Sequence, residues 1–226
     1  DLVAGRRLGA FGLTEPDAGS DAGGTRTRAR YDTASDEWVL DGSKAFITNS
    51  GTAITSVVAV TALTAPGEIS SFIVPAGTPG MTIEPPYRKL GWHASDTHGI
   101  TLADCRVPAG NMLGAQGSGL RNFLAILDDG RIAISALAVG CAQACLDPAV
   151  DYAKERQAFG GPIGRFQGLA FQLADLAVAV ENSRNLTYGA ARSKDRGKPF
   201  RQAAAMAKLY STETAVTATR VATQVF

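Results

Sequence analysis

The feature that most constrains this chain is a change of hydrophobic period at the stretch GAQGSG, residues 114–119. Before it, short apolar runs alternate with clusters of Gly, Pro, Asp and Ser, which is typical of strands in a barrel or sandwich. After it, apolar residues recur every three or four positions, the period of a helix, at Leu120, Phe123, Leu124 and Leu127. The sequence therefore predicts an α+β protein, with a strand-rich domain at residues 1–112 and a helical domain at 113–226.

Six runs in the first part have the length and composition of β-strands. They are EWVLDG, KAFITNS, SVVAVTAL, SSFIVP, MTIEP and GITLADCRVP. The dipeptide Asp41-Gly42 stands at the end of the first run, and Asp-Gly between two apolar runs is a strong hairpin signal. We therefore expect a β-barrel or β-sandwich with a hairpin at Asp41-Gly42.

The second part predicts at least three helices. Phe166, Leu169, Leu173, Leu176 and Val180 mark the apolar face of the second, and residues 200–226 form the third. The third has no Gly or Pro stop signal, so we expect the sequence to end inside a helix, in a truncated bundle. Within the first, Asp147-Pro148 should produce a kink or a helix restart with Asp147 as N-cap, because proline removes a backbone donor.

Composition excludes several classes of protein. The 226 residues include 22 basic and 21 acidic side chains, a net charge of +1 that does not favour nucleic acid or an anionic membrane as partner. The apolar runs are too short for a membrane span, and no secretory leader pattern is present. Three cysteines without CxxC spacing indicate a reducing compartment. Cys141 and Cys145 lie one helical turn apart, and we expect them to be buried packing residues.

The stretch FGLTEPDAGSDAGG, residues 11–24, concentrates acidic side chains and glycines. It lacks the spacing of a calcium-binding loop, so we expect no metal there. With only His93 and His98 in the chain, a histidine-based triad or metal site is not expected either. Two interpretations remain open from the residues alone. The glycines let the backbone approach a flat or anionic ligand, or the stretch is an ordinary turn at the rim of a barrel.

Four motifs resemble the acyl-CoA dehydrogenase family. FGLTEPDAGSD is similar to its flavin-binding signature TEPxAGSD, and FITN at residues 46–49 to its W/F-I-T-N strand. KLGWHASDTHGITLADCRVP resembles its K-x-G-x-x-x-S-x-T segment, and YAKERQAFGGPIGRFQGLAFQLADLA its helix, E-R-x-x-F-G loop and next helix. The motifs follow one another in the family's order over almost the whole chain. The resemblance implies an internal segment, without the N-terminal helical domain and the C-terminal end.

The resemblance implies a function: FAD-dependent α,β-dehydrogenation of an acyl-CoA thioester. In the family a carboxylate takes the α proton, and the β hydrogen passes as hydride to flavin N5. The implied partners are acyl-CoA, an electron-transfer flavoprotein or similar acceptor, and further copies in a homodimer or homotetramer. The implied location is the bacterial cytoplasm, preferred over the mitochondrial matrix. Two alternatives stay open, namely a non-catalytic flavin- or subunit-binding relative and an oxidase or monooxygenase of the same fold.

The resemblance also implies cofactor contacts from two segments of the strand-rich domain. Phe11, Leu13 and Thr14 match positions that contact the isoalloxazine. Phe46, Ile47 and Thr48 match a strand whose aromatic ring lies against the flavin and whose threonine hydroxyl reaches N5. A hydroxyl suits that place because it can both donate and accept. Phe46 keeps the apolar face of the tryptophan found in many members but lacks its indole donor.

Further positions match contacts to the substrate and to the FAD of a neighbouring subunit. The implied acyl-CoA contacts are Ser20, Asp128 and Arg131. The implied contacts to the neighbouring subunit's FAD are Arg156, Phe159, Gln167 and Gln224. An i, i+3 surface pair is the alternative for Asp128 and Arg131. Ala158 and Phe166 replace a threonine and a histidine found in relatives, so we expect fewer polar contacts to FAD.

The catalytic base is expected outside these 226 residues. One of the two positions that the family uses is Gly130 here, and glycine takes no proton. The other lies beyond Phe226. The acids of residues 11–24 are expected to belong to a turn that positions Thr14 and Ser20, with Glu15 pointing away from the substrate.

The 226-residue chain, expressed by itself, is therefore expected to catalyse no acyl-CoA dehydrogenation. Proton transfer needs a group within about 3 Å of the hydrogen, and no matched residue is a candidate base. Reduction of an artificial electron acceptor in the presence of acyl-CoA measures this. Turnover that Glu15→Gln abolishes would contradict the assignment of Glu15 to a turn.

Overall fold

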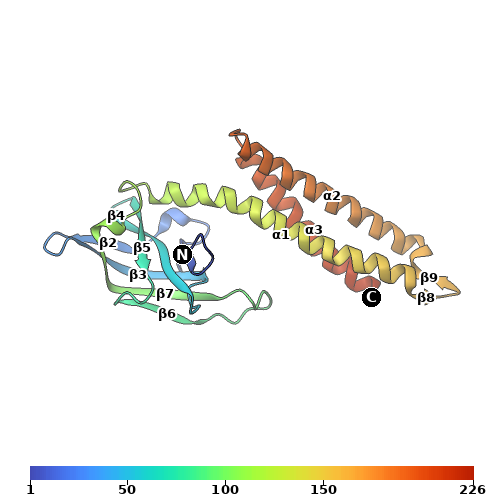
Figure 1. Ribbon diagram of the computed structural model, residues 1–226, viewed down its shortest axis with the longest axis horizontal. Helices are drawn as coiled ribbons and strands as arrows, with labels where there is room; N and C mark the ends of the chain where they lie inside the picture. The colour runs from blue at the N-terminus through green and yellow to red at the C-terminus, as the bar shows by residue number, and fades with distance from the viewer. The chain divides into compact units, whose positions relative to one another are not determined.

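The computed structural model describes residues 1–226, which form two compact units, Asp1–Leu124 and Ala125–Phe226 (Figure 1). The first unit contains strands and the second contains helices, as the change of period predicted. The division falls inside the first long helix, after Leu124.

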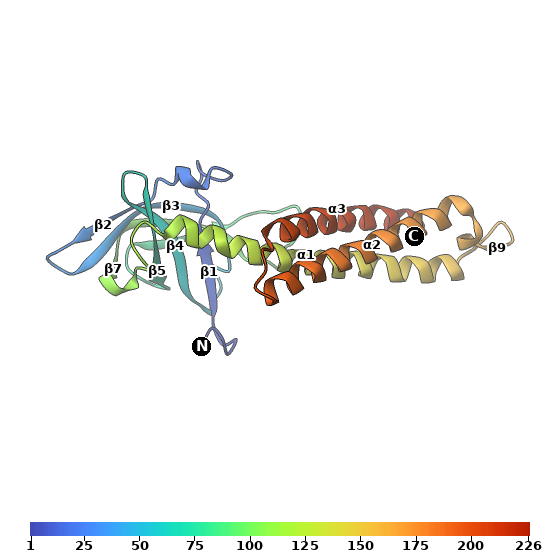
Figure 2. The same cartoon turned by 90° about the horizontal axis from the view of Figure 1, so that it is seen from above.

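The first unit is one seven-stranded sheet that curls around an apolar core (Figure 2). Its strands are β1 (Leu8–Gly12), β2 (Arg28–Asp32), β3 (Glu37–Thr48), β4 (Thr55–Ala65), β5 (Glu68–Pro75), β6 (Met81–Pro86) and β7 (Thr97–Pro108). The order is β1-β4-β2-β3-β7-β6, with β5 paired to β4. Alternate side chains of these strands form the core, among them Leu40, Val58, Phe72, Ile100 and Val107. The segment 56–63, expected as a strand, lies within β4.

The hairpin predicted at Asp41-Gly42 is wrong. Both residues lie inside β3, where the pairing with β7 shifts register between Leu40 and Gly42. Gly42 has φ +150°, and a Cβ there would stand 2.6 Å from the Thr27 Cα. The close approach of the two backbones therefore requires a glycine at this position. The hairpin next to β3 is instead formed by β2 and β3, where Asp32 pairs with Glu37.

The second unit is a bundle of three helices that run alongside one another (Figure 2). They are α1 (Gly119–Glu155), which begins in the first unit, α2 (Gln167–Asp195) and α3 (Arg201–Val225). A short hairpin of β8 (Gln157–Ala158) and β9 (Gly161–Pro162) joins α1 to α2. The buried Ala142, Ala149 and Ala218 lie in the apolar core together with Leu146 and Leu173. Small residues at these places let the helices pack closely.

Two expectations about α1 are corrected. The helix continues through Asp147-Pro148, so the restart with Asp147 as N-cap is wrong, while the kink stays a prediction. Asp147 instead accepts a hydrogen bond from Gln143 Nε2 at 2.6 Å. The flanking residues Leu146 and Ala149 are buried, and their packing offsets the hydrogen bond that proline removes. Cys141 is exposed and Cys145 is half-buried, so Cys141 is not the buried thiol that the spacing suggested.

By length and composition, α1 is the one helix that could cross a membrane. Its most apolar window has a mean hydropathy of 1.5 and is 33% buried in the structure. The core helices of soluble proteins pass the same test, and α1 contributes Leu146, Ala149 and Ala153 to the core of the helical unit. The feature is weak support for a membrane span.

Gly42 gives a test of the fold. We expect Gly42→Ala to lower the free energy of unfolding by about 1–3 kcal/mol, because the new methyl group overlaps Thr27. Gly110→Ala is a matched control, since a Cβ there meets nothing within 4 Å, and it should change stability by less than about 0.5 kcal/mol. Urea unfolding followed by circular dichroism measures both, and equal stability of the two variants would contradict the proposed contact.

Candidate functional site

The end of β1 and the end of β3 meet at one place in the strand-rich unit. The Ala45 amide donates a hydrogen bond to the Thr14 carbonyl at 2.9 Å. Lys44 Nζ, 31 residues from Leu13 in the chain, donates to the Leu13 carbonyl at 3.4 Å. These bonds place Leu13 and Thr14 beside the segment 46–48, so the two groups of expected cofactor contacts lie together.

Phe46 combines backbone strain with exposure. Its φ is +59°, which is uncommon for a bulky residue, and it lies where the pairing of β3 with β7 shifts register between Lys44 and Ile47. The residue is 64% exposed, and its ring centroid lies 4.9 Å from that of Tyr87. Strained backbone and an exposed aromatic at the same residue indicate a binding face, because neither is favourable for folding alone.

The next two residues point in opposite directions. Ile47 is 1% exposed and belongs to the core, so its side chain does not face the surface. Thr48 is exposed, and its hydroxyl makes no hydrogen bond within the chain. This alternation follows from the two-residue repeat of a strand, and it leaves the Thr48 hydroxyl free to donate or accept.

Phe11 is held by the first turns of α1. Its ring stacks on that of Phe123, with centroids 4.2 Å apart and an interplanar angle of 25°. Phe123 itself is 2% exposed, while Phe11 is half-buried. The contact ties the end of β1 to the start of α1.

Glu15 is the centre of a buried hydrogen-bond network. Its Oε1 accepts from Thr25 Oγ1 at 2.6 Å, from Lys44 Nζ at 2.8 Å and from the Thr27 amide at 3.1 Å, and its Oε2 accepts from the Arg26 amide at 2.6 Å. Burial raises the pKa of Glu15, but these bonds outweigh burial and lower it to about 2. Burial also lowers the pKa of Lys44, although Glu15 opposes that change. Glu15 is thus held ionised inside the protein.

Sequence reasoning missed Lys44 in this arrangement. A lysine at the start of the apolar run AFIT, inside a predicted strand, was the available signal, because a buried lysine needs a partner. The other acids of the stretch do not converge. Asp17 forms an exposed ion pair with Arg26 at 2.7 Å, and Ser20 is exposed in the loop between Asp17 and Asp21. No group of His, Cys, Asp and Glu side chains has the geometry of a metal site.

His98 is a structural anchor for the turn after Thr48. Its Nδ1 lies 2.6 Å from the Glu84 carbonyl and its Nε2 lies 2.7 Å from Asp96 Oδ1. Burial lowers the pKa of His98, but Glu84 and Asp96 outweigh burial and raise it. Asp96 Oδ2 in turn accepts from the Gly51 amide at 2.8 Å, so the pair ties the turn to β7.

Four expected cofactor contacts gather at one end of the helical unit, around β8, β9 and the C-terminus (Figure 1): Arg156, Phe159, Gln167 and Gln224. The Ile163 amide donates to the Arg156 carbonyl at 2.9 Å, and Tyr152 and Phe226 bring α1 and α3 together with ring centroids 4.9 Å apart. Phe159 has φ +51° and is 89% exposed. The four side chains are exposed, which suits contact with another molecule.

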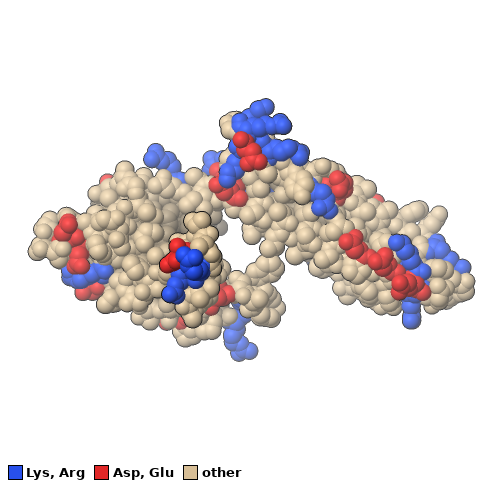
Figure 3. Space-filling model, in the orientation of Figure 1, with Lys and Arg blue, Asp and Glu red and all other residues tan.

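Asp128 and Arg131 lie at the other end of the helical unit, near the start of α3. They form an ion pair with each other, and Arg201 Nε lies 3.4 Å from Asp128 Oδ2. Lys194 and Asp129 form a second pair at 2.9 Å. Basic side chains gather around the connection between α2 and α3 (Figure 3). The i, i+3 pair that was the alternative interpretation of Asp128 and Arg131 is therefore present. Gly130, between them in the sequence, has open space around it, since a Cβ there would meet nothing within 4 Å.

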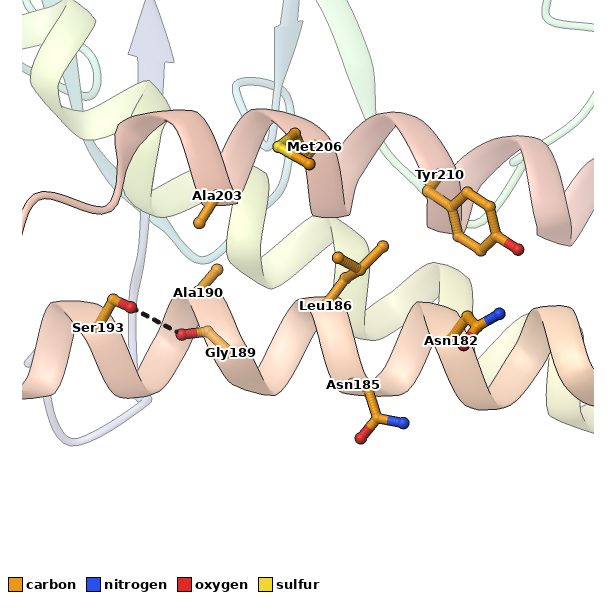
Figure 4. A pocket seen from close by; sticks show the side chains of 9 residues that line it. All are labelled: Asn182, Asn185, Leu186, Gly189, Ala190, Ser193, Ala203, Met206 and Tyr210. Atoms are coloured by element: carbon orange, nitrogen blue, oxygen red, sulfur yellow. Dashed lines mark hydrogen bonds between the residues drawn. The ribbon is translucent and has the colours of Figure 1, made fainter.

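A hollow lies between α2 and α3 (Figure 4), lined mainly by Leu186, Ala190, Met206 and Tyr210. None of the expected site residues lines it. The hollow is mainly apolar, with Asn182, Asn185 and Ser193 as further lining residues, and it has no charged side chain to pair with the phosphates of a nucleotide cofactor.

Comparison with known proteins identifies the family of both units. Residues 10–105 match the model of the acyl-CoA dehydrogenase middle domain, and residues 117–226 match that of the acyl-CoA dehydrogenase C-terminal domain. The chain belongs to the acyl-CoA dehydrogenase family.

Individual relatives show how much of a family member the chain covers. It is 50% identical to the "Probable acyl-CoA dehydrogenase YngJ" of Bacillus subtilis, over 99% of this chain and 59% of that protein. The structure of butyryl-CoA dehydrogenase from Megasphaera elsdenii superposes with a TM-score of 0.95 at 44% identity, over 100% of this chain and 59% of that one. A structure described as the electron transferring flavoprotein of Acidaminococcus fermentans gives 0.93 at 42% identity, over 97% and 58%. The chain thus spans less than two thirds of these relatives.

The Glu15 network makes stability depend on pH. The pKa of Glu15 is about 2 when folded and 4.5 in its ordinary state, so its contribution is complete above pH 4.5 and is lost as the pH falls toward 2. The shift corresponds to roughly 3 kcal/mol. We expect the urea midpoint of the unmodified chain to exceed that of Glu15→Gln near neutral pH and the gap to close between pH 4.5 and 2. Asp17→Asn is the control, and a gap independent of pH would refute the assignment.

Proposed function

We propose that the protein containing this chain is an FAD-dependent acyl-CoA dehydrogenase that removes hydrogens from the α and β carbons of an acyl-CoA thioester. The observation that carries the proposal is the exposed, strained Phe46 near the free hydroxyl of Thr48, in a strand whose Ala45 amide donates to the Thr14 carbonyl. A flat ligand with a polar edge suits an aromatic face next to a hydroxyl. Butyryl-CoA is the first substrate to assay, since the similar solved structure is a butyryl-CoA dehydrogenase.

The residues present fit a flavin. On the strand-rich unit, Phe11, Leu13, Thr14, Phe46 and Thr48 would hold the isoalloxazine, and Ile47 would support this face from the core. FAD, when bound, supplies the acceptor for the two electrons and the β hydrogen. The Thr48 hydroxyl would hydrogen-bond the ring nitrogen N5, and the exposed ring of Phe46 would exclude water from one face.

The second set would bind the FAD of a neighbouring copy. Arg156, Phe159, Gln167 and Gln224 gather at one end of the helical unit. No side-chain hydrogen bond within the chain occupies Arg156, Gln167 or Gln224, so their donors are available. An exposed guanidinium suits a phosphate or a nucleotide. This supports a homodimer or homotetramer in which two chains share each flavin.

The acyl-CoA would be bound by Ser20, Asp128 and Arg131. Ser20 is exposed in its loop, and Arg131 is 37% exposed at its side chain. Asp128, which is only 15% exposed, orients Arg131 and leaves part of the guanidinium free for the CoA moiety. The base that takes the α proton would come from outside these residues, since Glu15 is buried and ionised by its own partners.

Electrons would leave the flavin for an electron-transfer flavoprotein or similar acceptor, in the bacterial cytoplasm in preference to the mitochondrial matrix. We expect no membrane span and no nucleic acid among the partners. Oxygen consumption with acyl-CoA, in place of dye reduction, would instead identify an oxidase or monooxygenase of the same fold. FAD binding without either activity would identify a non-catalytic relative.

Thr48 gives the test of this function. In the full-length protein, Thr48→Val should keep FAD but slow its reduction by acyl-CoA, because one positioned hydrogen bond worth about 1–3 kcal/mol is lost. Stopped-flow absorbance at the flavin band measures the rate. Thr48→Ser, which keeps the hydroxyl, and Thr82→Val, an exposed threonine of β6, are controls that should reduce at nearly the original rate. An unchanged rate in Thr48→Val would exclude this role.

A further inference from the structure

The largest fully buried side chain in the protein is a lysine. Lys44 Nζ lies 2.8 Å from Glu15 Oε1, 3.1 Å from Thr61 Oγ1, and 3.4 Å from both the Leu13 carbonyl and Thr25 Oγ1. These partners belong to the segment after β1, the segment before β2, and β4, while Lys44 itself lies in β3. One ammonium group thus joins four parts of the unit.

Burying the Glu15–Lys44 ion pair carries a large desolvation free energy. Removing two charges from water costs several kcal/mol per ion, and apolar residues of similar volume often stabilise a protein as well or better. Lys44 is 0% exposed and Glu15 is 4% exposed at their side chains, so the cost is borne almost in full. Stability alone therefore does not account for the pair, and its geometry is the feature that apolar residues would not reproduce.

The pair flanks the proposed flavin site on both strands. Glu15 directly follows Thr14, and Lys44 directly precedes Ala45, whose amide donates to the Thr14 carbonyl at 2.9 Å. Phe46, the residue after Ala45, has a left-handed backbone conformation. A shift of either charged residue would therefore move the Thr14 carbonyl, the Ala45 amide and the ring of Phe46 together.

We propose that Glu15 and Lys44 are positioning residues, whose buried ion pair holds the Thr14 segment against residues 46–48 and so sets the geometry of the flavin-facing surface. Neither side chain would contact the ligand, because both are buried. The inference rests on the proposed function for its ligand. The mutual placement of the two segments is a property of the unliganded chain as well.

The test separates positioning from stability by removing both charges at once. In the full-length protein, Glu15→Gln/Lys44→Met leaves no unpaired buried charge, so it should fold, as judged by circular dichroism and thermal melting. We expect the apoprotein of this variant to bind FAD at least about tenfold more weakly, by quenching of flavin fluorescence, and to show a shifted visible flavin spectrum. Asp17→Asn removes one charge of the exposed pair with Arg26. It should change the FAD affinity by less than about twofold and leave the flavin spectrum unchanged.

A second readout needs no flavin. The Ala45 amide should exchange its hydrogen faster in the unliganded double variant than in the unmodified apoprotein, since its bond to the Thr14 carbonyl loses support. If the double variant does not fold, Thr61→Val takes its place, because it removes one hydroxyl partner of Lys44 and keeps the ion pair. We expect Thr61→Val to weaken FAD binding and to speed the exchange of the Ala45 amide, each by less than the double variant does.

A folded double variant with the original FAD affinity, flavin spectrum and Ala45 exchange rate would overturn the inference. If the double variant fails to fold, a Thr61→Val variant unchanged in all three properties would overturn it as well. Failure of the unmodified protein to bind FAD has a different meaning. That result contradicts the proposed function, and the coupling of the two segments is then decided by the Ala45 exchange alone.

Discussion

The hydrogen bond from the Ala45 amide to the Thr14 carbonyl, supported beneath by the Glu15–Lys44 ion pair, is the interaction on which the strand-rich unit's candidate site depends. It joins two segments that are far apart in the chain. On its buried side lie charged and hydroxyl side chains that satisfy one another. On its exposed side lie Phe46 and Thr48, one strained and the other without a partner. Lys44 and Glu15 are therefore satisfied without a ligand, although the buried Thr27 hydroxyl beside them has no partner, and the outer face is open for binding.

The helical unit separates its exposed polar residues in a different way. Small residues such as Ala149 and Ala218 bring the helices into close packing, and the β8–β9 hairpin turns the chain between α1 and α2. As a result, the side chains expected to bind a neighbouring flavin gather around Arg156 at one end. Asp128 and Arg131 lie at the other end, beside Arg201. Helix length thus keeps apart two groups of residues with different proposed ligands.

Much of the fold could be predicted because strands and helices have distinct periods. The predicted strands from EWVLDG to GITLADCRVP all lie within observed strands or extend into the turns that follow them. β1 and β2 were missed, since LGAFG and RARYD are too short or too charged to show alternation, and they become strands by pairing with β4 and β3. Asp41-Gly42 and Asp147-Pro148 misled for one reason. Local turn and cap chemistry was outweighed by long-range packing around both dipeptides.

The sequence by itself determined the succession of strands and helices, the acyl-CoA dehydrogenase motifs and the position of each motif along the chain. These properties depend on neighbouring residues, which a one-dimensional pattern records. Only the tertiary structure decided that Lys44 is the partner of Glu15, that Arg201 lies beside Asp128, and that Ile47 faces the core while Thr48 faces outward. Burial decides these pairings, because a charge removed from water must find whichever partner the fold brings near it, however distant in sequence.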